Sequence, residues 1–259
     1  MLNTVIYPSQ QPTDNPPLLI VHGLFGSARN WGVMARRLSD VRTVLAVDMR
    51  NHGSSFWSDA HSYEAMADDL AKVIAAHGGQ ADVVGHSMGG KAAMVLALAH
   101  GATTRRLLVG DIAPVAYQHD QSPNIKAMKS LNLSAIRNRA EADAALAQSL
   151  ADESLRAFLL QSLDFKTTPI SWRINLEALE ASMPGIVGWP DISGQFEGPV
   201  LFLSGGASHY VQTESRLKIR AYFPKARFAK IPNVGHWLHA ENPRAFEETL
   251  RLFLGSAQD

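Results

Sequence analysis

The sequence Ala81-Asp82-Val83-Val84-Gly85-His86-Ser87-Met88-Gly89 passes from a short apolar run into a segment rich in alanine and leucine. The apolar run predicts a strand and the following segment predicts a helix, so the chain turns sharply at Ser87. Gly85 and Gly89 allow the strand and the helix to approach each other closely. We interpret the turn as a nucleophile elbow, which holds the Ser87 hydroxyl above a sheet and places a helix N-terminus beneath it.

Other apolar runs extend this pattern along the chain. Short stretches rich in valine, isoleucine and leucine recur at residues 17–22, 43–48, 81–85, 106–110, 199–204 and 226–231, and a weaker candidate covers residues 2–7. Helical patterns follow most of them, including Ser62 to His77, Met88 to His100 and Pro243 to Leu254. Continuous apolar strands that alternate with helices predict an α/β fold with a mostly parallel, doubly wound sheet.

The stretch from residue 115 to 194 breaks the alternation and holds no convincing strand. Apolar residues recur at helical spacing in Glu153 to Leu163 and again in Trp172 to Met183. We expect a helical cap inserted into a core made of residues 1–114 and 195–259. Its apolar residues form a satellite core, line a site for an acyl group, or do both.

Composition bounds the class of protein. The 259 residues carry 24 basic and 24 acidic side chains, and basic residues cluster no further than pairs, so neither nucleic acid nor an anionic membrane surface is an expected partner. The absence of cysteine excludes disulfides and thiolate sites and suits a reducing compartment. The start of the sequence lacks the features of a secretory signal, and no apolar run approaches the ~20 residues of a membrane span. We expect a cytoplasmic protein.

A serine nucleophile needs a base, and ten histidines compete for that role. His236 follows the last predicted strand, in a loop at the carboxyl edge of the sheet where Ser87 also lies, so it is the predicted base. His86 flanks the nucleophile and is expected to point away from it as a packing or hydrogen-bonding residue. His239 could pair with His236 on a metal, but no third ligand stands at suitable spacing, and no metal site is predicted.

An oxyanion formed at Ser87 needs two hydrogen-bond donors. The backbone N–H of Met88 directly follows the nucleophile, and the N–H of Leu24 lies in the glycine-rich turn His22-Gly23-Leu24-Phe25-Gly26 after an early strand. We predict that these two amides form the oxyanion hole. The alternative for the glycine-rich turn is an ordinary strand-to-helix connection with Ser27 as helix N-cap.

These motifs, together with Asp48-Met49-Arg50-Asn51-His52-Gly53-Ser54-Ser55 and Gly235-His236, resemble the α/β-hydrolase superfamily from about residue 17 to the end. The stretches His22 to Ser27, Gly85 to Lys91, Asp111-Ile112-Ala113-Pro114 and Trp172-Arg173 are similar to the YbfF-type bacterial esterases. The resemblance implies the α/β-hydrolase fold and a serine esterase that acts on acyl esters beneath a helical lid.

The triad acid departs from the superfamily pattern. It usually follows the next-to-last strand, yet no Asp or Glu occurs between Glu197 and Glu214, and Ser208 stands near the expected position. Asp111, which follows the strand after the elbow, can reach the same space from the other side. The resemblance to YbfF-type esterases implies that Asp111 is the triad acid and that Ser208 adds a hydrogen bond. Asp48 is the competing carboxylate, and we expect it to hold its own turn by hydrogen bonds.

The predicted function is hydrolysis of short- to medium-chain acyl esters through a Ser-His-Asp triad and an acyl-enzyme, without a cofactor. The partner is a small-molecule ester, and its expected pocket is lined by Phe25, Tyr117, Trp189, Tyr210 and Trp237, although each could equally belong to the core. A thioesterase, a carbon–carbon bond hydrolase, a perhydrolase side activity or a non-catalytic ligand-binding protein stays open. Dehalogenase and epoxide-hydrolase chemistry is disfavoured because it needs a carboxylate in place of Ser87. The oligomeric state cannot be read from one chain.

Overall fold

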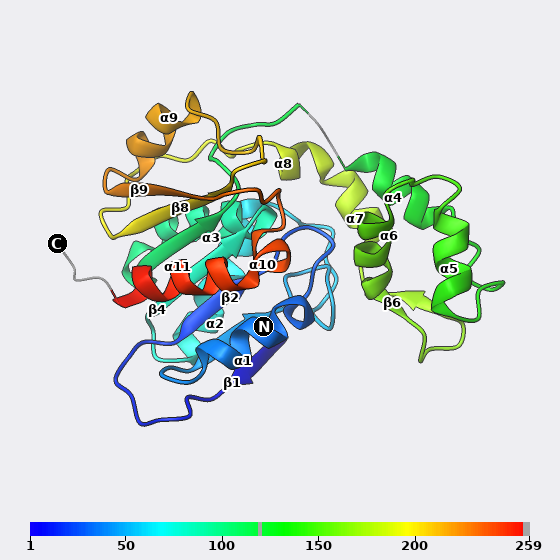
Figure 1. Ribbon diagram of the computed structural model, residues 1–259, viewed down its shortest axis with the longest axis horizontal. Helices are drawn as coiled ribbons and strands as arrows, with labels where there is room; N and C mark the ends of the chain where they lie inside the picture. The colour runs from blue at the N-terminus through cyan, green and yellow to red at the C-terminus, as the bar shows by residue number, and fades with distance from the viewer. Residues whose placement is uncertain (119–120, 256–259) are drawn as a thin grey trace.

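The computed structural model describes residues 1–118 and 121–255 and contains one central sheet of seven strands (Figure 1). The strand order is β1-β3-β2-β4-β5-β8-β9, and all neighbours run parallel except β1, which is antiparallel to β3. The strands are β1 Thr4–Tyr7, β2 Leu18–Val21, β3 Val44–Val47, β4 Ala81–His86, β5 Thr104–Gly110, β8 Val200–Gly205 and β9 Ala226–Ile231. Each predicted strand is confirmed, with ends shifted by two residues at most.

Helices cover both faces of the sheet, as the continuous burial of β2, β3 and β4 requires. Two long helices, α2 Tyr63–Ala76 and α3 Met88–Ala99, together with α9 Ser215–Tyr222, pack on one face. On the other face lie α1 Gly32–Leu38 and α11 Pro243–Gly255, next to the one-turn helix α10 Leu238–Glu241. Ser62 caps α2 as predicted, because its hydroxyl accepts a hydrogen bond from the Ala65 amide.

The segment between β5 and β8 forms a group of short helices beside the sheet (Figure 1). They are α4 Ser122–Lys129, α5 Arg139–Leu146, α6 Glu153–Leu159, α7 Leu176–Ala181 and α8 Met183–Val187. Buried apolar side chains from residues 127 to 163 form a separate small cluster within this group. We call residues 115–194 the cap segment.

The expectation that the cap segment holds no strand was wrong. β6 Leu163–Asp164 pairs antiparallel with β7 Ser171–Trp172. Trp172 therefore lies in a strand, and the helix expected from that residue onward begins only at Leu176. Asn175 caps it by accepting a hydrogen bond from the Ala178 amide. A pairing of two residues per strand is too short to give an alternating pattern, which explains why the helical spacing dominated the prediction.

Within residues 1–118 and 121–255, no helix has both the length and the apolar character needed to cross a bilayer. The cytoplasmic location expected from the sequence stays a prediction.

Candidate active site

Ser87 lies between β4 and α3, with φ 53° and ψ −121°. Residues other than glycine rarely adopt this strained backbone conformation. Its amide donates a hydrogen bond to Gly110 O at 3.0 Å. A Cβ on Gly85 would overlap the carbonyl group of Gly89, and a Cβ on Gly89 would overlap the carbonyl oxygens of Val21 and His22, so both positions need glycine. The elbow expected from the sequence is therefore formed at the carboxyl end of β4.

The loops after β5 and β9 bring two more groups to Ser87. His236 Nε2 lies 3.0 Å from Ser87 Oγ, and His236 Nδ1 lies 2.7 Å from Asp111 Oδ2. Asp111 is fully buried, with φ 51°, directly after β5. The hydroxyl of Ser208 also donates to Asp111 Oδ2, and the Gly205 amide donates to Asp111 Oδ1 at 3.1 Å. The structure brings together all four residues that the sequence proposed for the chemistry.

Other candidates lie outside this chain of contacts. Asp48 accepts a hydrogen bond from the Ser54 amide at 2.9 Å and so holds its turn as expected, and it also accepts from the Ala28 amide at 2.8 Å, which ties that turn to an earlier segment. His86 points away from Ser87, and its Nε2 lies 2.7 Å from His236 O. Burial lowers the pKa of His86, so its neutral ring can donate this hydrogen bond and fix the His236 backbone.

His239 is half-buried and stacks on Trp31, with the two ring centroids 3.9 Å apart. Burial, followed by the charge of His236, lowers the pKa of His239 to about 3. The neutral ring thus forms part of an aromatic wall beside the site.

The amides expected to receive an oxyanion lie next to Ser87. A Cβ built on Gly23 would come within 3.1 Å of Ser87 Cβ, so the glycine-rich turn touches the elbow directly. The Gly26 amide donates to Gly23 O at 3.0 Å, which closes the turn. Within the part of the chain that the structure describes, the Leu24 and Met88 amides have no hydrogen-bond acceptor. Both amides can therefore donate to a substrate oxygen.

A cavity of about 290 Å³ opens at Ser87. Four of the five aromatic residues expected to line it do so: Phe25, Tyr117, Tyr210 and Trp237. The cap segment contributes Leu155 and Phe158 to the cavity, whereas Leu163 from the same predicted helix belongs to the small cap cluster. Some apolar residues of the predicted helix Glu153 to Leu163 thus line the cavity, and others belong to the satellite core.

Trp189 does not belong to the lining. Its ring packs against Tyr222, with centroids 5.7 Å apart, at the edge of the main core. The expectation that it lines the pocket was wrong, and the alternative of a core role holds, because its ring packs toward α9 rather than toward Ser87.

Sequence reasoning missed several lining residues, including Tyr63 and Lys91. Lys91 lies one helical turn after Ser87 in α3, and that spacing of four residues could have placed it on the same face. Tyr63 comes from the start of α2, and no sequence signal points it toward the elbow.

A serine elbow, an imidazole from the last loop and a buried carboxylate, mounted on this sheet, define an α/β hydrolase. The profile of the alpha/beta hydrolase family matches residues 18–249, and the chain belongs to that family. Within it, the chain is similar to esterase YbfF of Escherichia coli (strain K12), with 39% identity over 257 residues covering 98% of each sequence.

Two further comparisons agree with this placement. The chain is 39% identical over 248 residues to the sn-1-specific diacylglycerol lipase ABHD11 of Mus musculus, covering 92% of this chain and 81% of that protein. A solved structure described as a marine microorganism esterase matches with a TM-score of 0.91 and 34% identity, covering 97% of this chain and 98% of the other.

Proposed function

We propose that Ser87, His236 and Asp111 form a catalytic triad that hydrolyses esters of short- to medium-chain carboxylic acids through an acyl-enzyme. The chain is a carboxylic-ester hydrolase, the class to which its named esterase and lipase relatives belong. The observation that carries the triad is the unbroken line of contacts from Ser87 Oγ through both nitrogens of His236 to Asp111 Oδ2.

In the first step, Ser87 Oγ attacks the carbonyl carbon of the ester while His236 Nε2 takes the hydroxyl proton. The carbonyl oxygen becomes an oxyanion that accepts hydrogen bonds from the Leu24 and Met88 amides. Collapse of this intermediate breaks the bond to the alcohol, which leaves with the proton from His236. Asp111 stabilises the transient imidazolium.

In the second step, water attacks the carbonyl carbon of the acyl-enzyme and His236 takes its proton. A second oxyanion forms in the same place, and its collapse returns the proton to Ser87 Oγ and releases the carboxylic acid. The five protein groups end as they began, so the cycle consumes only ester and water.

The cavity supports the proposed acyl length. Leu155, Phe158 and Tyr117 line it from the cap segment, and Tyr210 lines it from the core. The two tyrosine rings lie 5.3 Å apart, and the Tyr117 hydroxyl donates to Tyr210 O at 2.7 Å. A wall fixed by such contacts suits a small acyl group better than a long fatty chain.

A fluorophosphonate probe tests the nucleophile, because it labels an activated serine and leaves an idle hydroxyl untouched. Wild-type protein should be labelled, and Ser87→Ala should lose both labelling and turnover of a p-nitrophenyl ester. Labelling that persists in Ser87→Ala would refute the assignment, and an unlabelled wild type would favour a ligand-binding role.

Aryl esters of increasing acyl length test the substrate class, with the matching thioesters measured beside them. We expect kcat/KM to peak at short or medium acyl groups. A peak at long acyl groups would instead match the lipase names among the relatives. Phe158→Ala should move the peak toward longer chains, because it removes a ring that covers the cavity.

A further inference from the structure

Two buried histidines bracket the turn that carries the Leu24 amide. His22 Nδ1 lies 2.8 Å from Gly23 O, on one side of Leu24. On the other side, the Phe25 amide donates to His52 Nε2 at 3.2 Å. Both histidines are buried, and their ring centroids lie 5.1 Å apart. Consecutive peptide groups around Leu24 are therefore each held by an imidazole.

The partners of His52 fix its protonation. A backbone N–H can only donate, so Nε2, which receives the Phe25 amide, carries no proton. The single ring proton then lies on Nδ1 and is donated to Arg50 O at 3.0 Å. His22 repeats this pattern, because its Nε2 accepts from the Met49 amide at 2.9 Å and its Nδ1 faces Gly23 O.

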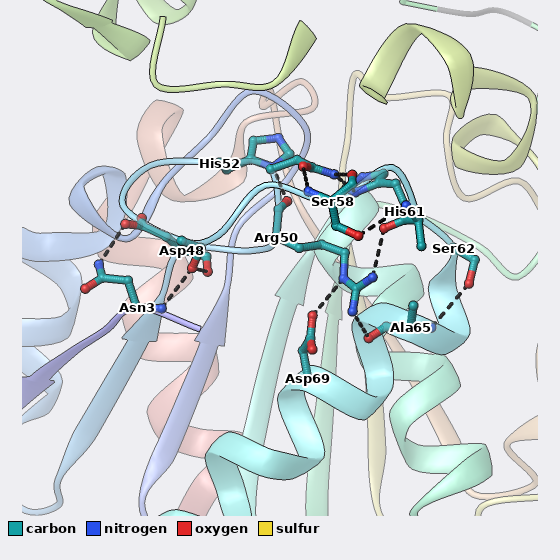
Figure 2. Close-up of polar contacts among 12 residues, drawn as sticks. Asn3, Asp48, Arg50, His52, Ser58, His61, Ser62, Ala65 and Asp69 are labelled. Atoms are coloured by element: carbon teal, nitrogen blue, oxygen red, sulfur yellow. Dashed lines mark hydrogen bonds and ion pairs between the residues drawn. The ribbon is translucent and has the colours of Figure 1, made fainter. Parts of the chain in front are cut away.

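The surroundings keep both rings neutral. Burial lowers the pKa of His22 and lowers that of His52 well below its ordinary value. The groups around them are Asp48, bound to backbone amides, and His61, whose pKa burial lowers to about 4. Arg50 also lies near these rings, and its guanidinium group pairs with Asp69 at 2.7 Å below the loop (Figure 2).

The turn needs such support because of its backbone. Phe25 has φ 64°, a left-handed conformation that is strained for a bulky side chain. Gly23 O accepts from His22 and from the Gly26 amide. Because a trans peptide points its carbonyl and its N–H in opposite directions, these bonds aim the Leu24 N–H away from His22.

The loop that carries His52 is itself anchored to the cap segment. His52 forms an antiparallel bridge with Ile174, and the Asn175 amide donates to Asn51 O at 3.0 Å. From the cap segment, the hydroxyl of Ser162 donates to Phe25 O at 3.1 Å. His52 thus stands where the turn, the loop after β3 and the cap segment meet.

We propose that His52 is a positioning residue for ester hydrolysis, which acts by holding the Phe25 amide and so aiming the Leu24 N–H at the oxyanion. The inference rests on the proposed function. His52 touches no reacting atom, and its effect should appear in transition-state stabilisation rather than in substrate binding.

Two substitutions separate the two hydrogen bonds of this ring. Gln places its Oε1 as many bonds from Cα as His Nε2, so His52→Gln keeps an acceptor for the Phe25 amide. Asn places its Nδ2 as many bonds from Cα as His Nδ1, so His52→Asn keeps only the donor to Arg50 O. Each variant loses the ring and one hydrogen bond, so the two should lower the stability of the fold by similar amounts. His61→Gln serves as a control in the same cluster, since His61 contacts Asn51 and not the turn.

The measurements are kcat and KM on a p-nitrophenyl ester, the inhibition constant of phenylboronic acid, and Tm. Loss of a whole oxyanion donor costs about 10²–10³ in kcat, so a misaimed donor in His52→Asn should cost roughly 10- to 100-fold. KM should change by less than about threefold, and the boronic acid should weaken in parallel with kcat. His52→Gln and His61→Gln should keep kcat within about threefold of wild type.

Equal losses of kcat in His52→Asn and His52→Gln would overturn the positioning role, and so would wild-type kcat in His52→Asn. Ser87→Ala, measured in the same series, distinguishes the two levels of the argument. Turnover retained in Ser87→Ala refutes the proposed function together with this inference. Turnover lost in Ser87→Ala but unchanged in His52→Asn refutes the positioning role alone.

Discussion

Ser208 donates a hydrogen bond to Asp111 Oδ2, the same carboxylate oxygen that lies 2.7 Å from His236 Nδ1. The second oxygen, Oδ1, accepts from the Gly205 amide. Gly205 and Ser208 belong to the end of β8 and the loop after it, which is where the acid of the wider superfamily was expected. That loop therefore supports a carboxylate from the neighbouring strand instead of supplying one, and a buried Asp111 has a partner for each oxygen.

We predict that Asp111→Asn lowers kcat by roughly 10³- to 10⁴-fold, because an amide cannot stabilise the imidazolium and favours the wrong tautomer of His236. The measurement is steady-state hydrolysis of a chromogenic ester. Asp48→Asn is the matched control, since Asp48 accepts hydrogen bonds from the amides of Ala28 and Ser54 and none from His236. Asp48→Asn should act mainly on Tm, and it should lower kcat much less than Asp111→Asn does. Near-normal turnover in Asp111→Asn, or a larger loss in Asp48→Asn, would contradict the assignment of the acid.

Ser208→Ala should have a smaller effect on the same carboxylate. It removes one of three hydrogen bonds to Asp111, and we expect kcat to fall by about 5- to 20-fold while KM stays nearly constant. Ser208→Thr keeps the hydroxyl and should retain most of the activity. If Ser208→Ala were as damaging as Asp111→Asn, the serine would carry more of the acid's role than this geometry supports.

Gly85→Ala tests the packing of the elbow. The added methyl group would overlap the Gly89 carbonyl, so either the strand or the helix must move, at a cost of about 1–3 kcal/mol or more in the free energy of unfolding. Activity should fall with it, because the Ser87 backbone shifts. Gly185→Ala is the control, since a Cβ there meets nothing within 4 Å. Urea denaturation should show the loss only in Gly85→Ala, and an unchanged midpoint would be inconsistent with a closed elbow.

Much of the fold follows from local sequence features. Strands that are buried on both faces have continuous apolar sequences, and the glycines around Ser87 mark a turn where strand and helix come into contact. The order of the motifs also places His236 at the carboxyl edge of the sheet. Asp111 needed more than local pattern, namely the resemblance to a family and the absence of a carboxylate after β8.

The remaining features depend on contacts between distant segments. His52 lies in the stretch Asp48 to Ser55, yet nothing in that stretch indicates that the Phe25 amide, 27 residues away, donates to its ring. Trp189 and Trp237 are both tryptophans that the sequence places near the site. Trp237 lines the cavity, whereas Trp189 packs on Tyr222 and belongs to the core. Burial and aromatic character do not encode such choices in one sequence.

The end of α8 is held by polar groups of the core. The Tyr63 hydroxyl donates to Ile186 O at 2.6 Å, and Lys91 Nζ donates to Val187 O at 3.0 Å and also to Gly188 O. Three successive carbonyl groups at a helix C-terminus are thus satisfied by two side chains. Lys91 is buried, and its nitrogen lies 4.8 Å from the centre of the Tyr117 ring.

Burial, with a smaller effect from Lys218, lowers the pKa of Lys91 to about 7 from its ordinary value of 10.5. Between these two pH values the unfolded chain binds a proton that the folded chain does not, so the free energy of unfolding rises with pH across that window. Lys91→Met lacks this titration. The stability of wild type relative to Lys91→Met should therefore increase from pH 7 to pH 9, by about 2 kcal/mol, since each pH unit there is worth about 1.4 kcal/mol. Urea denaturation of both proteins at pH 6, 7, 8 and 9 measures the difference. A difference that stays flat or shrinks over this range would show that Lys91 remains charged against the carbonyl groups of α8.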